Sequence, residues 1–340
     1  MKNIFKNKTV LITGGTGFIG KTLLKYILDK NPHAVRVFSR DEVKHHLLQE
    51  EFAEFCRGND RKLRCLVGDV RDYERLKKAT QGCDIVIHAA AMKRIDMIEY
   101  NVAESIKTNV IGTLNVINSC LENNVEKVLY VSSDKACSPI NTYGACKFIS
   151  ERIFIESNFS KGAAKTVFSI VRYGNVLEST GSLIPTIINK IKNNSDLFLT
   201  DPRMTRFFIT KEQAIDLIFN ALDSGVGGEI FVPKINSFKV VDVLELLKEN
   251  YGSQRKIRVV GIRPGEKIHE LMINKDESRR TFEFGNTFVI ASEIEKWHRR
   301  ITYDYLKNKK SFPFDEYNSK DFVIPKDELR KKLKVCGIIN

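Results

Sequence analysis

The chain has 340 residues, of which 42% are hydrophobic and 29% charged, a composition typical of a folded globular protein and not of a disordered one. Its length allows one large α/β domain and a smaller lobe. The formal net charge of +13 favours anionic ligands such as nucleotides, phosphosugars or nucleic acid. Basic clusters at 307–310 and 330–334 lack the interleaved aromatic side chains of a single-strand binding platform, so we predict no nucleic acid partner.

The seven cysteines form no CxxC pair and no zinc-like spacing. This scattered set predicts reduced thiols in the cytoplasm and no bound metal. The first 13 residues lead straight into a strand and lack the architecture of a signal peptide. Because no apolar run approaches the roughly 20 residues of a membrane-spanning helix, we expect a soluble protein without membrane insertion.

Short apolar runs alternate with helical patterns through the first half of the chain. Strands are predicted at residues 9–12, 35–38, 63–67, 84–88, 127–131 and 167–171, and a first helix at 17–29. Buried continuous strands that alternate with helices are typical of α/β proteins with a Rossmann-type, doubly wound parallel sheet.

The rhythm changes past about Asn175, where glycines and prolines interrupt the pattern. We expect a smaller, mixed α/β C-terminal lobe that binds the substrate. The predicted Rossmann domain covers 1–175, with return segments near 207–235, and the lobe covers 176–206 and 236–340. The amphipathic segment 211–222 and the strand-like segment 229–232 are the residues expected to return to the main sheet.

A glycine motif, GxxGxxG, follows the first strand and opens the first helix. Glycine permits a tight turn and close backbone approach, and a helix N-terminus presents N–H groups to a pyrophosphate. In this strand–turn–helix context the motif predicts a dinucleotide site. The predicted contacts are Gly14, Thr16, Gly17, Phe18, Ile19 and Gly20.

The end of the second strand selects the cofactor. A carboxylate at this point binds a ribose 2′-hydroxyl, whereas the pair Ser39 and Arg40 suits a 2′-phosphate. Asp41 follows and keeps NAD open, although it could equally cap the next helix. We therefore predict NADP rather than NAD. Asp69 and Val70 come where such folds meet the adenine, and Asp69 could instead be only a helix cap.

A second motif follows the strand at 127–131. Residues 132–135 read Ser-Ser-Asp-Lys, and Tyr143 and Lys147 then form a YxxxK pair. A spacing of four places both side chains on one helical face, where the Lys147 ammonium can lower the phenol pKa and hold the cofactor ribose. A bare YxxxK arises often by chance, but downstream of the glycine motif and a serine at a strand end it is specific.

These motifs resemble the extended short-chain dehydrogenase/reductase superfamily and, more narrowly, the inverting UDP-N-acetylglucosamine 4,6-dehydratases (5-epimerising). Asp134 followed by Lys135 is the most telling feature, since glucose-type dehydratases have Asp-Glu there and retaining dehydratases have Met in place of Tyr143. The resembling segments are TGGTGFIGKT, SRDE, GDVRD, HAAAMK, EYNVAESIKTNV, SSDKACSPINTYGACK, RYGNV, DPRMTRFFIT, GGEIFVPK and GIRPGEKIHE. The stretch 178–182 departs from the family's usual Gly-Ser-Arg-Gly-Ser.

The resemblance implies a mechanism. Tyr143, with Ser133 and Lys147, would deprotonate the sugar C4 hydroxyl as hydride passes to NADP. Neutral Lys135 would remove the C5 proton, and neighbouring cations and desolvation are expected to lower its pKa. Protonated Asp134 would donate to the leaving C6 hydroxyl. The hydride then returns to C6, so this lyase would recycle its NADP.

The resemblance also implies the remaining contacts. Further cofactor contacts are Ala89, Ala90, Ala91, Asn109, Ser132, Tyr173 and Val176. The substrate, UDP-N-acetylglucosamine or a close UDP-hexosamine, would contact Lys93, Asn175, Ser182, Arg206, Arg263 and Glu266. The product, a UDP-2-acetamido-2,6-dideoxy-hexos-4-ulose, would serve surface-glycan or nonulosonic acid biosynthesis. A homo-oligomer, a dimer or hexamer, is expected, with predicted helices at 102–123 and 143–158 as its packing surface.

Three alternative functions stay open. A UDP-N-acetylglucosamine 5,6-dehydratase or a UDP-sugar 4-epimerase would share the fold and the Tyr143–Lys147 pair. Asp134 and Lys135 argue against the epimerase, because epimerisation at C4 needs no elimination acid. A non-catalytic NADP-sensing regulator would be expected to lose Tyr143 or Lys147, and both are present.

Overall fold

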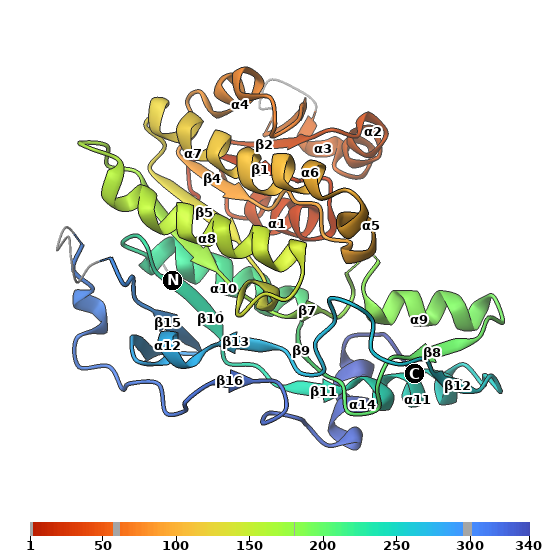
Figure 1. The fold of residues 1–340 in the computed structure, drawn as a ribbon. Helices are drawn as coiled ribbons and strands as arrows, with labels where there is room; N and C mark the ends of the chain where they lie inside the picture. Colours follow the sequence, from red (N-terminus) through yellow and green to blue (C-terminus); the bar gives the residue numbers. More distant parts are fainter. Residues whose placement is uncertain (1–2, 57–61, 180, 295–300) are drawn as a thin grey trace.

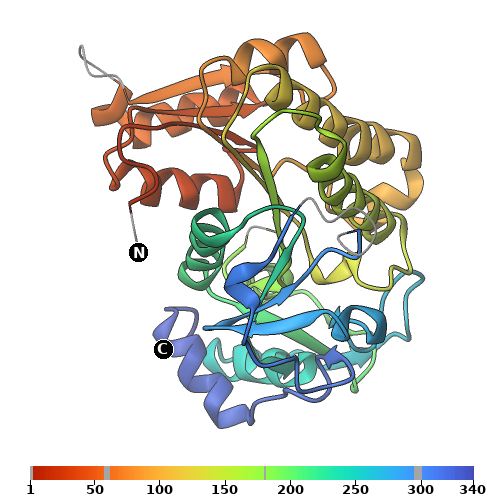
Figure 2. The same cartoon turned by 90° about the vertical axis from the view of Figure 1, so that its left-hand side faces the viewer.

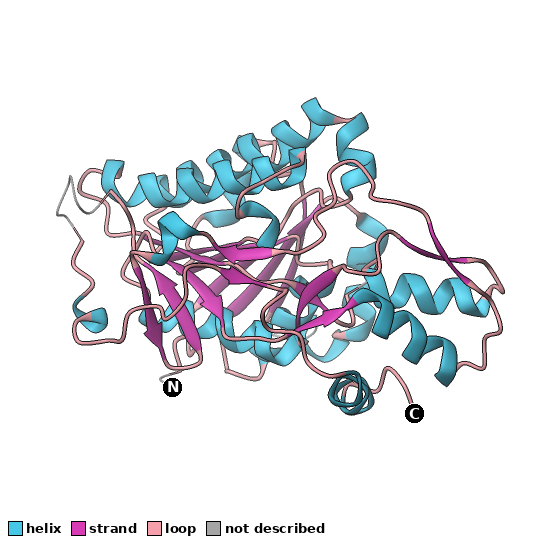
Figure 3. Ribbon diagram, turned by 60° about the horizontal axis from the view of Figure 1, so that its bottom comes forward, coloured by secondary structure: helices cyan, strands magenta, loops and turns pink. Residues whose placement is uncertain are grey.

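The computed structural model describes residues 3–56, 62–179, 181–294 and 301–340. A nine-stranded sheet runs through it in the order β14-β15-β10-β6-β5-β4-β1-β2-β3, with helices on both faces (Figures 1 and 3). Its strands are β1 (Thr9–Thr13), β2 (Ala34–Ser39), β3 (Leu63–Val67), β4 (Ile85–His88), β5 (Lys127–Val131), β6 (Val167–Val171), β10 (Ile230–Pro233), β14 (Thr281–Phe284) and β15 (Thr287–Ile290). Seven neighbouring strands of this sheet, β10-β6-β5-β4-β1-β2-β3, pair in parallel. The predicted doubly wound parallel sheet is confirmed.

Helices cover the sheet because each buries an apolar stripe against it. Helices α1 and α10 pack together, and α7 packs against both α4 and α8. The helices of this part are α1 (Phe18–Leu28), α2 (Glu42–Glu51), α3 (Ala53–Cys56), α4 (Tyr73–Thr80), α5 (Ile95–Tyr100), α6 (Val102–Ser105), α7 (Gly112–Glu122), α8 (Thr142–Ser160) and α10 (Lys211–Ser224). The predicted helix at 102–123 is interrupted by a π-helical turn, Ile106–Ile111, a feature that is frequent beside functional sites.

The remaining elements lie mainly in a C-terminal lobe on one side of the main sheet (Figure 2, cyan to blue). Three small sheets have the orders β11-β9-β7, β12-β8 and β13-β16. Their strands are β7 (Asn175–Val176), β8 (Leu197–Leu199), β9 (Thr205–Ile209), β11 (Ser237–Lys239), β12 (Ile257–Val259), β13 (Leu271–Ile273) and β16 (Tyr317–Asn318). The helices are α9 (Leu183–Lys192), α11 (Val240–Asn250), α12 (Lys275–Ser278) and α14 (Lys326–Val335), with 3₁₀ turns at Asp134–Ala136 and Asp304–Leu306.

The lobe has an apolar core of its own, separate from the core of the main sheet. Leu197, Leu246 and Leu329 are among its buried residues. Strand β9 borders both cores: Phe207 and Ile209 belong to the main core, whereas Phe208 belongs to the core of the lobe. Alternate side chains of a strand point to opposite sides, so this one short strand joins the two parts.

Segment 229–232 returns to the main sheet as predicted, since β10 pairs with β6. The range 236–340 is not all lobe, however, because β14 and β15 inside it extend the main sheet by antiparallel pairing. Gly285, with a φ of +55°, forms the tight turn between these two strands. Their sequence shows only short apolar strands, and the sheet that they join is decided by tertiary contacts.

Two further features concern the chain as a whole. All seven cysteines are free thiols. Within the described residues, none of the helices combines the length and the apolar character that crossing a bilayer requires.

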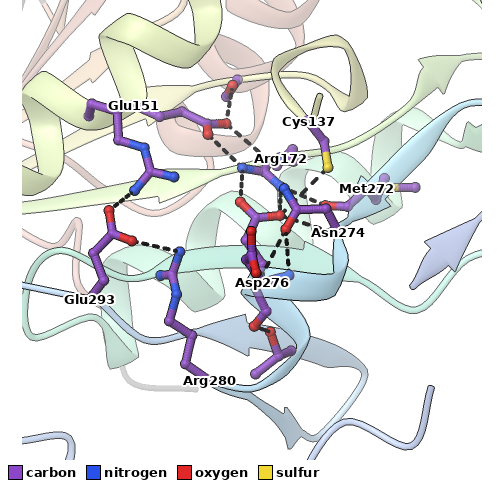
Figure 4. Close-up of polar contacts among 12 residues, drawn as sticks. Cys137, Glu151, Arg172, Met272, Asn274, Asp276, Arg280 and Glu293 are labelled. Carbon is purple, nitrogen blue, oxygen red and sulfur yellow. Dashed lines mark hydrogen bonds and ion pairs between the residues drawn. The ribbon is translucent and has the colours of Figure 1, made fainter. Parts of the chain in front are cut away.

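A buried charge network connects the main sheet to the lobe (Figure 4). Arg172, which directly follows β6, has no exposed surface. It donates to Glu151 of α8 at 2.6 and 3.0 Å, to Glu277 of α12 at 2.9 Å twice, and to the Met272 carbonyl at 2.6 Å. Burial opposes ionisation of Glu277, but the guanidinium outweighs it and lowers the pKa of Glu277 to about 2. The charges of the network therefore compensate one another.

Arg172→Met should destabilise the protein by about 3–5 kcal/mol, because two buried carboxylates would lose their counter-charge. Urea unfolding would measure the loss. Arg203→Met, which removes an exposed guanidinium paired with Asp201, is the control that changes little.

The stability of the wild-type protein should also depend on pH through Glu277. Because the folded-state pKa of Glu277 is depressed, its contribution to the free energy of unfolding is complete above its unfolded pKa of about 4.3. That contribution should fade as the pH falls from there towards about 2. An Arg172→Met protein as stable as wild type would contradict this account.

Candidate active site

A cavity of about 1160 Å³ lies at the carboxyl ends of the parallel strands. It extends from the glycine turn after β1 to the loop 263–267 of the lobe. Strand order reverses between β1 and β4, and open α/β sheets bind ligands at such a switch point. All predicted site residues except Asn109 line this cavity. The structure thus gathers in one place residues that the sequence spreads from Gly14 to Glu266.

The glycine turn has the geometry of a phosphate-binding loop. Gly14 has a φ of +68°, and a Cβ there would lie 2.8 Å from the backbone of Ala90. A Cβ on Gly20 would lie 2.5 Å from the Gly14 carbonyl oxygen. Helix α1 begins at Phe18 without a side-chain cap at Gly17, and the residues of its first turn line the cavity. An uncapped helix N-terminus of this kind is a suitable site for an anion.

The end of β2 supplies the groups that were expected to select the cofactor. Ser39 Oγ lies 2.9 Å from both Thr16 Oγ1 and His45 Nε2, and the Arg40 side chain is 60% exposed at the cavity rim. Asp41 accepts a hydrogen bond of 3.0 Å from the Lys44 N–H and caps α2, which was the alternative considered for it. Lys44 also lines the cavity, and sequence reasoning missed this second cation.

Asn109 is not among the residues that line the cavity, and its predicted contact with the cofactor stays a prediction. It lies in the π-helical turn, where its side-chain oxygen accepts from the Met92 N–H at 2.8 Å and its amide donates to the Met92 carbonyl at 3.0 Å. Asn109 therefore holds the loop that follows β4, and this loop, through Ala89, Ala90, Ala91 and Lys93, forms the cavity wall.

The four residues after β5 and the start of α8 form the polar centre of the cavity. Ser133 Oγ donates to Asp134 Oδ1 at 2.8 Å, and Lys135 Nζ lies 3.0 Å from the same oxygen. Tyr143 is buried beside them. The pKa of Tyr143 is raised to about 12. Burial is the largest cause and Asp134 adds to it, whereas Lys135 and a hydrogen bond with Ser133 act to lower the pKa.

Lys147 is not among the groups that shift the Tyr143 pKa, contrary to that part of its predicted role, and its contact with the cofactor ribose stays a prediction. Its buried ammonium donates to the Val131 carbonyl at 2.7 Å and lies 4.5 Å from the centre of the Tyr130 ring. Burial lowers the pKa of Lys147 to about 7, against the opposing charge of Glu151. In this arrangement the cation that lowers the Tyr143 pKa is Lys135, not Lys147.

The pKa shift predicted for Lys135 is wrong in direction. Burial lowers its pKa as predicted, but the carboxylates of Asp134 and Glu270 outweigh burial and the nearby Arg206, so the pKa is raised. Glu270 lies 3.6 Å from Lys135 Nζ. The sequence could not show this neighbour, since 135 residues separate the two.

The residues that were expected to contact the substrate come from both parts of the protein. Lys93 donates to Ser179 Oγ at 3.3 Å, and Glu266 accepts from Thr200 Oγ1 at 3.1 Å. Arg206 already donates to the carbonyls of Thr205 and Ile268, whereas Arg263 is exposed.

Unsatisfied polar atoms concentrate in this cavity. Among the described residues, seven buried side-chain oxygen or nitrogen atoms have no hydrogen-bond partner, and five belong to residues that line the cavity. These five are in Thr108, Asp134, Asn175, Ser182 and Glu270. Buried polar groups are normally paired, so their clustering indicates a polar ligand that completes the site.

Lys135→Met should raise the pKa of Tyr143 further, because the substitution removes the cation that lowers it. Lys147→Met should move it much less. A pH titration of tyrosine ring carbons by ¹³C NMR, assigned with Tyr143→Phe, would measure both. A larger rise of the Tyr143 pKa in Lys147→Met than in Lys135→Met would show that Lys147 lowers this pKa, as the sequence predicts.

Comparison with known proteins agrees with this geometry. Residues 10–292 match the family described as "Polysaccharide biosynthesis protein". The Campylobacter jejuni "UDP-N-acetylglucosamine 4,6-dehydratase (inverting)" is 43% identical over 294 residues, which cover 86% of this chain and 85% of that protein. A Rickettsia bellii "UDP-glucose 4-epimerase" is 38% identical and covers 85% of this chain and 84% of its own length.

Among solved structures, that of "Pen from Bacillus thuringiensis" superposes with a TM-score of 0.89 at 40% identity. The match covers 97% of this chain and 99% of that one. These relatives confirm the resemblance drawn from the motifs, and the chain belongs to the polysaccharide biosynthesis protein family.

Proposed function

We propose that the protein is an NADP-dependent UDP-N-acetylglucosamine 4,6-dehydratase that inverts C5. One observation carries the proposal: Ser133, Asp134, Lys135 and Tyr143 converge in one cavity with the glycine turn. The name of the Campylobacter relative supports it. The product would be a UDP-2-acetamido-2,6-dideoxy-hexos-4-ulose for surface-glycan or nonulosonic acid biosynthesis.

The cavity residues fit a dinucleotide with a 2′-phosphate. The N-terminus of α1 would hold the pyrophosphate, and Ser39, Arg40 and Lys44 would surround the 2′-phosphate. Bound there, NADP would supply an acceptor for a hydride from C4 and a source of hydride for C6. The predicted contacts with cofactor and substrate remain part of this proposal.

Tyr143 would take the proton of the C4 hydroxyl. In the ligand-free cavity burial raises its pKa to about 12 although Lys135 and Ser133 act to lower it. That pKa is high for a base, so the proposed role requires further stabilisation of the phenolate when the ligands are bound. Lys147, held against Val131, would contact the ribose and anchor the reacting end of the cofactor.

Asp134 and Lys135 would carry out the elimination as a pair. A proton that passes from the Lys135 ammonium to the Asp134 carboxylate turns the ion pair into an amine and a carboxylic acid. The amine can then take the C5 proton, and the acid can protonate the departing C6 hydroxyl, which leaves as water. At this stage both groups are charged again. Return of the hydride to C6 then requires a proton at C5, which the Lys135 ammonium or solvent water would give. That proton would set the configuration at C5, and in heavy water it would be deuterium. Burial penalises the two charges and so works towards the proton transfer from Lys135 to Asp134, whereas the attraction of the Lys135 ammonium to Asp134 and Glu270 opposes it in the ligand-free cavity.

A UDP-sugar 4-epimerase is the second candidate, because the Rickettsia relatives carry that name. It would use Tyr143 and the dinucleotide site and leave Asp134 without a task. A 5,6-dehydratase would use the same pair on the same substrate. The analysis of reaction products separates the three activities.

We also propose a cytoplasmic homo-oligomer, a dimer or hexamer. Free cysteines are typical of a reducing compartment. The segments considered for packing expose Ile106, Ile111 and Ile149, each 43–44% exposed. Met97 and Tyr100 of α5, just before the first segment, are 53% and 91% exposed. A monomer in sedimentation equilibrium would contradict the oligomer.

UDP-N-acetylglucosamine incubated with the protein in heavy water should lose one water and gain deuterium at C5, as measured by mass spectrometry and proton NMR. Lys135→Met should slow this exchange by about 10²–10⁴-fold, since it removes the proposed base. Lys165→Met, at an exposed lysine outside the cavity, is the matched control and should keep full activity. Exchange at the normal rate in Lys135→Met would exclude Lys135 as the base, and a C4 epimer without loss of water would support the epimerase.

Arg40→Ala should weaken NADP binding by about tenfold or more and leave NAD affinity nearly unchanged, because only the 2′-phosphate is expected to contact this guanidinium. Lys44→Ala should act in the same direction. Calorimetric titration of nucleotide-free protein would measure both affinities. An equal loss for NADP and NAD would contradict the proposed choice of cofactor.

A further inference from the structure

Glu270 is a charged residue of the cavity that ends the segment GIRPGEKIHE and was given no role there. It directly precedes β13 and is 3% exposed. Its Oε1 lies 3.6 Å from Lys135 Nζ and 3.6 Å from Arg206 Nε. Its Oε2 is buried and has no hydrogen-bond partner among the described residues. A buried carboxylate is costly unless cations compensate it, and here one of the two cations is the proposed base.

The backbone of Glu270 is fixed, so the position of its carboxylate is built into the fold. The Glu270 N–H donates to Ser319 Oγ at 2.8 Å, and the Ser319 N–H donates to the Glu270 carbonyl at 2.8 Å. Ser319 Oγ also lies 2.6 Å from Thr205 Oγ1 of β9. Three segments of the lobe therefore place one carboxylate opposite the loop that carries Lys135.

Four ionisable side chains surround Lys135. Asp134 lies in the same 3₁₀ turn, Tyr143 comes from α8, Arg206 from β9 and Glu270 from the segment before β13. Asp134 and Glu270 favour the ammonium form of Lys135, and Arg206 opposes them.

The two carboxylates cannot have the same task. Under the proposed function Asp134 carries a proton while Lys135 acts as a base, so Asp134 cannot hold the amine by its charge at that moment. A neutral amine still has N–H groups to donate, and Glu270 is the remaining carboxylate within reach.

We propose that Glu270 is the positioning residue of Lys135, whose buried carboxylate holds the amine in the cavity in both of its charge states. The chemical part of this inference rests on the proposed function. The part that concerns the charge of Lys135 does not, and it can be tested without a substrate.

The first test measures how fast acetic anhydride acylates Lys135 at fixed mildly alkaline pH, with mass spectrometry of the Lys135 peptide as readout. Only the neutral amine reacts. Glu270→Gln keeps the shape and removes the charge, so the Lys135 pKa should fall and its labelling rate should rise by about tenfold, the effect of one pKa unit.

Two further variants separate charge from access. Glu270→Asp shortens the side chain but keeps the charge, so its labelling rate should stay near that of wild type. Arg206→Met removes the opposing cation, so its rate should fall. Glu249→Gln, at an exposed carboxylate paired with Arg330, is the matched control without effect. Unchanged labelling in Glu270→Gln, or an equal rise in Glu270→Asp, would overturn the role of Glu270.

The second test follows deuterium exchange at C5 of UDP-N-acetylglucosamine against pH. Glu270→Gln should lower kcat by about tenfold with an unchanged KM and should move the alkaline rise of the exchange rate to lower pH, while Glu270→Asp restores the pH profile. A merely structural residue would lower the rate without moving the profile. If the labelling results hold and wild type leaves the sugar untouched, the proposed function is wrong and the charge relation stands. Exchange by wild type with the same profile in Glu270→Gln would overturn the inference alone.

Discussion

A single guanidinium, that of Arg172, connects the parts of this protein that form the cavity. It donates hydrogen bonds to carboxylates of α8 and α12 and to a backbone carbonyl of β13, and it has no contact with solvent. Glu151 passes the connection on, because its Oε1 also accepts a hydrogen bond of 2.6 Å from Ser132. Ser132 is the first residue after β5, so the strand end that carries Asp134 and Lys135 is fixed by the same network. Buried charges of this kind hold only in one arrangement, since any displacement leaves a charge without its partner.

The cavity itself combines burial with compensated charge. Burial raises the pKa of Tyr143 and lowers that of Lys147, whereas two carboxylates reverse the effect of burial on Lys135. Neighbouring groups in one site thus differ in proton affinity because their partners differ. Such separation is what acid–base chemistry requires of a site that must both accept and donate protons. The protein achieves it with side chains from β5, α8, β9 and the segment before β13.

The features that could be predicted from the sequence are local. The turn from Gly14 to Gly20 depends on backbone freedom and on close approach within a few residues, and the YxxxK spacing depends on one helical turn. The alternation of buried strands and helices likewise predicts the parallel sheet. For these features the residues that act together are neighbours in the chain.

The features that escaped prediction depend on contacts between distant segments. Glu270 is one of the two carboxylates that raise the pKa of Lys135, which was expected to be lowered. The side chain of Asn109 is hydrogen-bonded to the backbone of Met92. Lys147 donates to the Val131 carbonyl and is not among the groups that shift the pKa of the Tyr143 phenol, which it was expected to lower. Strands β14 and β15 join the main sheet although the chain reaches them through the lobe. In each case the partner lies beyond the range of a local pattern.

Strand β9 has one more consequence for how the two parts can move. Phe207 and Phe208 are sequence neighbours embedded in different cores, and Arg206 beside them faces Glu270. A rotation of the lobe against the sheet would have to pull one of these aromatic rings out of its packing. Because β9 is packed into both cores at once, its two aromatic rings resist rotation of the lobe against the sheet.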